Sequence, residues 1–173
     1  MIQVLLAPIP VLITMLMIVV AVMPWGGPAW TETALALLPA SCIYFWSRRR
    51  PQLIPAVVVF GCGLVLDVLT HGPLGVWACA ALAVALAGRM ARRVRPPLGW
   101  SKSAISAAGS LALAATLVAV LEAAFAWRAI PIVQQAQALA AACLAYPVLA
   151  GLLSLLDPLW PVADSRSLFA RGD

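Results

Sequence analysis

Long runs of hydrophobic residues dominate the chain, and short polar segments interrupt them. Six runs have the length of a helix, and the first of them contains no charged residue. A helix needs about 20 apolar residues to cross the roughly 30 Å hydrocarbon core of a bilayer. The pattern therefore predicts an all-α integral membrane protein with six transmembrane helices. We expect these helices at residues 4–23, 30–46, 53–69, 74–88, 103–127 and 132–156, followed by a tail at 157–173.

The third and fourth runs are the shortest, at about 15–17 residues or roughly 22–25 Å of helix. Their polar connection at residues 70–73 is consistent with two spanning helices and also with a re-entrant hairpin. We favour two spanning helices, because a bilayer thins locally around short helices. Within the connection, Gly72 is expected to adopt an unusual backbone angle and Pro73 to begin the next helix.

The composition differs strongly from that of a water-soluble domain. Hydrophobic residues make up 64% of the 173 residues and charged residues 10%, and the mean hydropathy is +1.03. Soluble domains have about 45–50% apolar and about 25% charged residues. We therefore expect membrane lipid to surround a single polytopic domain that covers residues 1–173.

The basic residues are distributed unevenly among the polar segments. Of the 11 Lys and Arg residues, ten lie at 48–50, at 89–102 and in the tail, and Arg128 is the exception. With six spans these three segments share one side, which the positive-inside rule places in the cytoplasm together with both termini. This distribution explains the net charge of +5 without a nucleic-acid partner. The arginines are expected to attract anionic lipid, and docking of a cytoplasmic protein is the alternative. Tyr44 and Trp46 are expected at the cytoplasmic interface, where aromatic residues collect.

Asp67 lies deep in a predicted span, roughly 21 Å along the third helix. A carboxylate at this depth normally faces protein rather than lipid. One interpretation is a ligand for an ion or a substrate. The other is an acceptor of hydrogen bonds from the backbone of the turn at 70–73 or from Arg128. We favour the acceptor.

Further polar residues are expected near the same end of the molecule as Asp67. They are His71, Glu122, Arg128, Gln134, Gln135 and Gln137. Such a group forms either a binding pocket or hydrogen bonds between helices, and amide and carboxylate side chains often join membrane helices. We favour hydrogen bonding between helices.

No motif for catalysis or for cofactor binding is recognisable. The chain has one histidine and contains no G-x-S-x-G, P-loop or dinucleotide fingerprint. The cysteines lie in apolar runs without CxxC spacing, which favours small residues at helix contacts over a disulfide or a metal site. We therefore expect no enzymatic activity, no cofactor and no metal. The cysteines are Cys42, Cys62, Cys79 and Cys143.

Residues 38–76 carry a series of short motifs whose order and spacing are more specific than any one of them. The series is Leu38-Pro39, Tyr44-Phe45-Trp46, Arg50-Pro51, Phe60, Gly63-Leu64-x-x-Asp67 and Gly72-Pro73-Leu74-Gly75. It resembles the family of the rod-shape-determining protein MreD, and outside this region the likeness is in hydropathy alone. As structural or partner-contact positions, the resemblance selects Pro39, Pro51, Phe60, Gly63, Asp67, Gly72 and Gly75.

The resemblance implies a non-catalytic membrane scaffold of the cell-wall elongation machinery, located in the bacterial inner membrane and involved in rod cell shape. The implied partners are the bitopic MreC, the actin-like MreB, and the glycosyltransferase and transpeptidase pair of peptidoglycan biosynthesis. The implied fold is similar to the six-helix substrate-binding subunits of energy-coupling-factor transporters. The alternative function is therefore that of a substrate-binding membrane subunit of a vitamin transporter.

Overall fold

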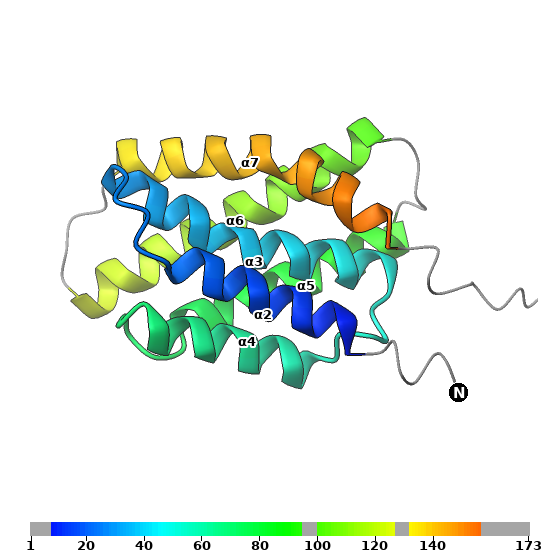
Figure 1. Cartoon of the computed structure of the whole chain (residues 1–173), viewed down its shortest axis with the longest axis horizontal. Helices are drawn as coiled ribbons and strands as arrows, with labels where there is room; N and C mark the ends of the chain where they lie inside the picture. The colour runs from blue at the N-terminus through cyan, green and yellow to red at the C-terminus, as the bar shows by residue number, and fades with distance from the viewer. Residues whose placement is uncertain (1–7, 95–99, 127–131, 157–173) are drawn as a thin grey trace, which may run out of the picture.

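The computed structural model describes residues 8–94, 100–126 and 132–156, and these residues form helices without a strand. The predicted all-α class and the order of six helices are thus confirmed (Figure 1). The helices are α2 (Ile9–Val22), α3 (Ala29–Arg49), α4 (Ala56–Leu69), α5 (Val76–Val94), α6 (Trp100–Ala126) and α7 (Ile132–Ser154).

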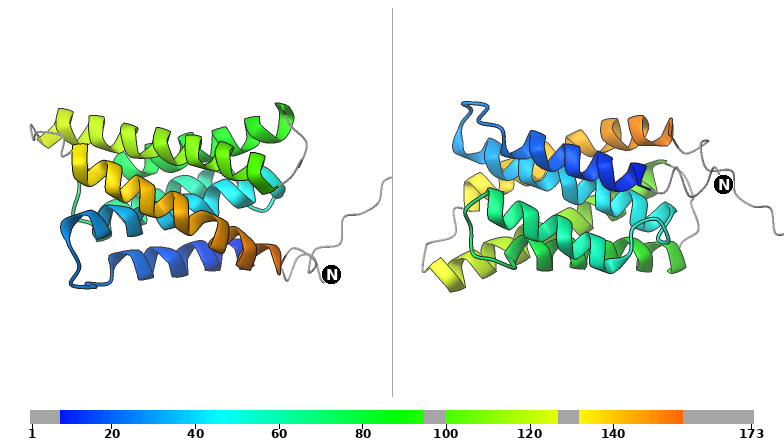
Figure 2. Two further views of the ribbon diagram at one scale, coloured as in Figure 1. Left: turned by 90° about the horizontal axis from the view of Figure 1, so that it is seen from above. Right: turned by 60° about the horizontal axis from the view of Figure 1, so that its bottom comes forward.

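Successive helices run in opposite directions, so that their connections gather at two ends of one bundle (Figures 1 and 2). Helix α3 lies at the centre and contacts α2, α5, α6 and α7, whereas α4 lies to one side against α5 and α2. We call the end at which α3 and α5 finish the arginine end, because it carries Arg48, Arg49, Arg50, Arg89, Arg92 and Arg93. The other end is the acidic end, with Glu32, Asp67 and Glu122.

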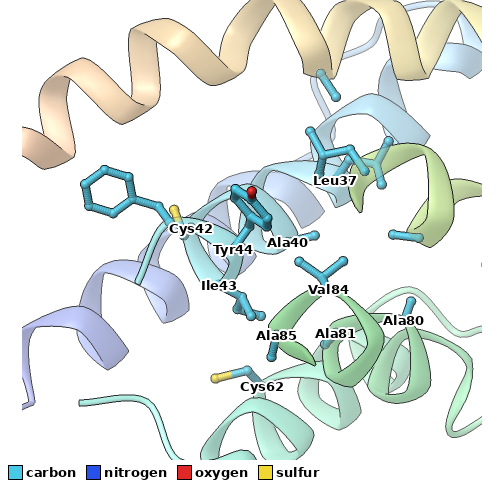
Figure 3. Close-up of a cluster of buried hydrophobic side chains, with 14 of the residues drawn as sticks. Leu37, Ala40, Cys42, Ile43, Tyr44, Cys62, Ala80, Ala81, Val84 and Ala85 are labelled. Atoms are coloured by element: carbon cyan, nitrogen blue, oxygen red, sulfur yellow. The ribbon is translucent and has the colours of Figure 1, made fainter. Parts of the chain in front are cut away.

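Small side chains bring α3 and α5 together along the middle of the bundle. Figure 3 shows Val84 of α5 directed toward Ala40 of α3, and Ile43 of α3 directed toward Ala85 of α5. At the arginine end a Cβ atom on Gly88 would lie 3.0 Å from the carbonyl oxygen of Tyr44. The two backbones therefore approach closely, as in membrane bundles where small residues line helix contacts.

Several helix boundaries differ from the predicted ones. Helix α3 ends three residues later than predicted, at Arg49, and α6 begins three residues earlier, at Trp100. Helix α5 continues to Val94 rather than ending at residue 88, so Arg89, Arg92 and Arg93 are helical and not part of a loop. Basic side chains are favourable in the last turns of a helix, where the dipole is negative. Helix α4 begins at Ala56 and not at residue 53, because Pro55 stands before it in an extended conformation. The first predicted run includes residues 4–7, which lie outside the described part of the chain.

Two described helices are both long enough and apolar enough to cross a membrane. They are Ala104–Phe125 within α6 and Ile132–Ser154, which is α7. Only 39% and 28% of their most apolar stretches are buried in the bundle, so most of this apolar surface points outward. Helices α2 and α4 are apolar but have 14 residues each, about 21 Å of helix. Six helices are thus confirmed, and six membrane crossings remain a prediction.

Candidate functional site

The Asp67 carboxylate joins the end of α4 to the beginning of α5. The side chain is fully buried, and Oδ1 accepts a hydrogen bond from the backbone N–H of Trp77 at 2.8 Å. Oδ2 accepts from the N–H groups of Gly75 at 2.9 Å and of Ala78 at 3.3 Å. The first N–H groups of a helix lack partners within that helix, and a negative charge there is favourable. Asp67 therefore caps α5 from another helix.

Asp67 accepts backbone hydrogen bonds, as the favoured interpretation expected, but not from the donors that it named. The N–H groups that it binds belong to Gly75, Trp77 and Ala78, a few residues beyond the predicted donors at 70–73. Each carboxylate oxygen accepts at least one of these bonds, and the side chain has no exposed surface. The geometry therefore describes a structural joint rather than a ligand site for an ion or substrate.

The turn between α4 and α5 explains how Asp67 reaches the next helix. After Thr70, the N–H of His71 bonds to the carbonyl of Val68 at 3.4 Å, and the N–H of Gly72 bonds to the carbonyl of Asp67 at 3.3 Å. This pattern is a Schellman motif, which usually has glycine in its left-handed position. Here His71 occupies that position, with a φ of +55°.

Two expectations about this turn are wrong. The positive φ angles belong to His71 and to Gly75, at +98°, and not to Gly72. Pro73 does not begin a helix, because α5 starts at Val76. The glycine at position 75 is the one that the backbone requires, since a side chain is strained at this φ.

Gly63 allows α4 to touch the backbone of α5. A Cβ atom at this position would lie 2.8 Å from the backbone nitrogen of Ala78 and 2.9 Å from the carbonyl oxygen of Trp77. These backbone atoms cannot move aside as the tip of a flexible side chain does. Gly63 and Asp67 lie one turn apart on α4, and both act on the first turn of α5. The spacing G-x-x-x-D thus has a clear packing reason.

Pro39 lies on the other side of this joint. It is buried within α3 and lines a small void together with Gly63 and Trp77. The void has a volume of about 10 Å³ and is lined by apolar atoms. That is about the space of one water molecule. A vitamin needs a pocket of roughly 300–1,000 Å³, so this void gives no support to the vitamin-binding alternative.

The remaining residues selected by the resemblance do not all meet at the joint. Pro51 lies in the turn after α3, near the arginine end and away from Asp67. Phe60 is 42% exposed on α4. Gly72 and Gly75 belong to the turn itself. The structure therefore brings together Pro39, Gly63, Asp67 and Gly75, and separates Pro51 and Phe60 from them.

Among the described residues, the polar side chains expected around Asp67 are not its hydrogen-bond partners. His71 is exposed although Asp67, four residues earlier in α4, is buried, and Gln134 and Gln137 are exposed at the start of α7. The Oε1 atom of Gln135 is buried without a hydrogen-bond partner among the described residues. Arg128 lies outside the described part of the chain.

A second polar contact, not predicted from the sequence, joins α3 to α6. The hydroxyl of Tyr44 on α3 and Oγ of Ser106 on α6 lie 2.6 Å apart, and Nη1 of Arg48 donates to that Oγ at 2.8 Å. The ring of Tyr146 on α7 meets the ring of Tyr44 edge-on, with centroids 6.0 Å apart. This contact joins three helices. The spacing of Tyr44 and Arg48, four residues apart on one helix, was the available signal.

The aromatic residues expected at the cytoplasmic interface lie near the arginine end of α3, and their side chains pack inside the bundle. Tyr44 and Trp46 are both fully buried. A buried tyrosine hydroxyl needs a partner. The hydroxyl of Tyr44 lies 2.6 Å from Ser106 of α6 and also accepts a hydrogen bond from Nη1 of Arg48 at 3.4 Å. The hydropathy of a single helix contains no information about this pairing.

The cysteines only partly follow the expectation of helix contacts. Cys42 and Cys62 are buried, whereas Cys79 is exposed and Cys143 is partly exposed, and all are free thiols. Among the described residues no three His, Cys, Asp or Glu side chains come together as metal ligands would.

Comparison of the chain with protein-family models, with curated proteins and with solved structures finds no match.

Proposed function

We propose that this chain is a polytopic protein of the bacterial cytoplasmic membrane and serves there as a non-catalytic scaffold for cell-wall elongation. In this proposal all six helices cross the bilayer, the arginine end and both termini face the cytoplasm, and the acidic end faces outward. The scaffold role and its partners, MreC, MreB and the peptidoglycan-synthesising pair, follow from the resemblance of residues 38–76 to the MreD family.

The observation that carries the membrane location is the large apolar surface between two charged ends. Exposed apolar side chains lie on the outer helices, among them Leu12 and Leu16 of α2 and Leu144, Val148 and Leu152 of α7. Soluble monomers rarely expose contiguous apolar patches larger than a few hundred Å². Exposure of this surface to water is unfavourable. In a membrane, hydrocarbon surrounds the apolar side chains, and the charged ends stay in the headgroups and in water.

The positions of the charges support the orientation. The described arginines lie at one end, and Glu32, Asp67 and Glu122 lie at the other. Basic residues beside spans favour the cytoplasmic side. Helix length supports the proposal directly for α6 and α7. Helices α2 and α4 have 14 residues each and are shorter than the hydrocarbon core is thick. Local thinning of the bilayer and the segments that flank these helices make up the difference in length.

The joint between α4 and α5 supports a scaffold rather than a moving carrier. Three backbone hydrogen bonds that Asp67 accepts and the close contact at Gly63 hold these helices in one relative position. Helix association in lipid depends on such packing and polar contacts, since lipid gives no hydrophobic drive. A rigid bundle presents its outer faces to single-span partners in a fixed orientation.

The test of the scaffold role is removal of the protein from a rod-shaped host. Depletion is expected to give rounded cells, and expression of the unchanged chain to restore rods. Crosslinking in membranes is expected to recover MreC with this protein. Unchanged rods after depletion, or recovery of a transporter ATPase module in place of MreC, would contradict the proposal.

A further inference from the structure

We infer that the arginine end of α5 binds the phosphate of an anionic phospholipid headgroup. The site consists of Arg89, Arg92 and Arg93 beside the turn that connects α3 to α4. This inference rests on the membrane location proposed above. A membrane location requires only a hydrocarbon environment, which neutral lipids also provide. The inference adds a specific contact between these arginines and an anionic headgroup.

The first observation is that two of these arginines are held in place by backbone carbonyls. Nη2 of Arg89 donates to the carbonyl of Ile54 at 2.9 Å, and Nη1 of Arg92 donates to the carbonyl of Arg49 at 3.3 Å. Each bond uses one donor of a guanidinium that has five. The remaining donors are positioned in advance, which lowers the entropic cost of binding a ligand.

The second observation is a buried donor that has no acceptor. Nε of Arg89 lies inside the protein surface and makes no hydrogen bond with the described residues. A buried donor without a partner is unfavourable, and natural structures rarely keep one. Phosphate oxygens are strong acceptors that guanidinium groups bind in pairs of parallel hydrogen bonds, and Arg89 gives this donor to a phosphate when its guanidinium turns outward.

The third observation is the charge balance at this end. Within the described ranges, neither Arg89 nor Arg92 nor Arg93 is paired with a carboxylate. The described acidic residues lie at the acidic end, at the opposite ends of α3, α4 and α6. The three positive charges therefore need a counter-charge, and the headgroups of the surrounding leaflet contain one.

The pattern along α5 favours a phospholipid over a soluble anion. Leu86 and Met90 are each 54% exposed, and Arg93 follows them at helical spacing on the same side of α5. This face changes from apolar to basic toward the arginine end. A phospholipid has the same order, from acyl chain to phosphate, whereas a soluble anion makes no use of the apolar part.

The test measures which lipid stays bound to the purified protein. The chain is extracted in detergent and incubated with equal amounts of phosphatidylglycerol and phosphatidylcholine, and retained lipid is quantified by native mass spectrometry. We expect preferential retention of phosphatidylglycerol. The double substitution R92Q/R93Q, at two exposed positions, is expected to lower that preference roughly thirtyfold, since each basic residue near an anionic surface contributes about fivefold. The single substitution Arg89→Gln tests the buried donor separately.

The matched control is R166Q/R171Q, which removes the same number of charges from residues outside the described ranges. Equal losses in the two double variants would indicate unspecific attraction and would overturn the site. Retention of both lipids to the same extent, or displacement of phosphatidylglycerol by an equal concentration of inorganic phosphate, would also overturn it. Each variant must have the same unfolding temperature as the unchanged protein. A variant that does not is replaced by Arg→Lys at the same position. Lysine keeps the charge but is expected to lose the paired hydrogen bonds.

Failure of the membrane location itself has a different signature. In that case carbonate washing of membranes would release the chain into the soluble fraction before any lipid is added. A chain that stays in the washed membranes but shows no lipid preference would leave the proposed function standing and remove only the headgroup site.

Discussion

Asp67 makes the polar contacts that connect α4 to the start of α5. Its carboxylate satisfies three N–H groups at the start of α5, which would otherwise have no partner in a dry environment. Water is scarce in the interior of such a bundle, so the alternative to these hydrogen bonds is an unsatisfied backbone. The residue is therefore required by the fold before any partner is considered.

The substitution Asp67→Asn tests this cap. The amide keeps one acceptor oxygen and places an NH2 group against backbone donors, so we expect a loss of about 1–3 kcal/mol in the free energy of unfolding. Unfolding of the detergent-solubilised protein, followed by tryptophan fluorescence, measures the loss. The control is Glu32→Gln, the same chemical change at an exposed position in the first turn of α3. It is expected to cost less than about 1 kcal/mol, and equal effects of the two changes would disprove the cap.

His71 gives a prediction of opposite sign. Its left-handed φ of +55° is unfavourable for a residue with a Cβ atom and natural for glycine. We expect His71→Gly to stabilise the protein by up to about 1 kcal/mol, measured as a rise in the unfolding temperature. His71→Ala keeps the strain and is expected to show no such rise. Loss of stability in the glycine variant would mean that the imidazole makes a contact of its own.

At the scale of the elements, the contact of α4 with α5 depends on one glycine. Gly63 faces the backbone of Ala78, whereas Gly61, two residues away on the same helix, has no atom within 4 Å of the place of a Cβ. The two positions share a helix and a residue type. Their comparison therefore separates helix propensity from packing.

We expect Gly63→Ala to destabilise the protein by about 1–3 kcal/mol or more, because the added methyl overpacks a backbone contact. Gly61→Ala is expected to be neutral or to stabilise by up to about 1 kcal/mol, since alanine is the better helix former. Denaturant unfolding of the two variants in one detergent provides the comparison. A harmless Gly63→Ala would show that α4 sits farther from α5 than described.

At the scale of the whole molecule, the two charged ends predict opposite exposure across the membrane. In a background with the cysteines replaced, Arg93→Cys is expected to react with a membrane-impermeant thiol reagent only after cells are opened. Glu32→Cys, at the acidic end, is expected to react in intact cells whose outer membrane has been made permeable. Labelling of both from outside would contradict the six-span arrangement, and the reverse pattern would invert it.

The fold was predictable from the sequence to the extent that it depends on local properties. Helix number, the order of helices and the shared end of the arginine segments follow from the lengths of apolar runs and the positions of charges. Each of these depends on how a short stretch of chain partitions between water and an apolar medium. Neighbouring residues suffice for that, and six of six expected helices are present in the described ranges.

The candidate site was predictable only in part. The motif from Gly63 to Gly75 lies within one hairpin, so its importance was visible locally, and the acceptor role of Asp67 was anticipated. The donors were misplaced, and the positive φ angle was assigned to Gly72. Backbone angles in a turn depend on how the flanking helices dock, which hydropathy does not determine.

Tertiary structure alone decided the contacts between distant segments. Tyr44 and Ser106 are 62 residues apart and meet because α3 and α6 are rotated toward each other in the bundle. Arg89 reaches Ile54, 35 residues away, because α5 extends beyond its apolar run to the α3–α4 turn. The apolar residues of a helix indicate that it prefers a nonpolar medium. Which of its faces meets a neighbour is decided by side-chain packing and by the need to pair buried polar atoms, and these are properties of the assembled bundle.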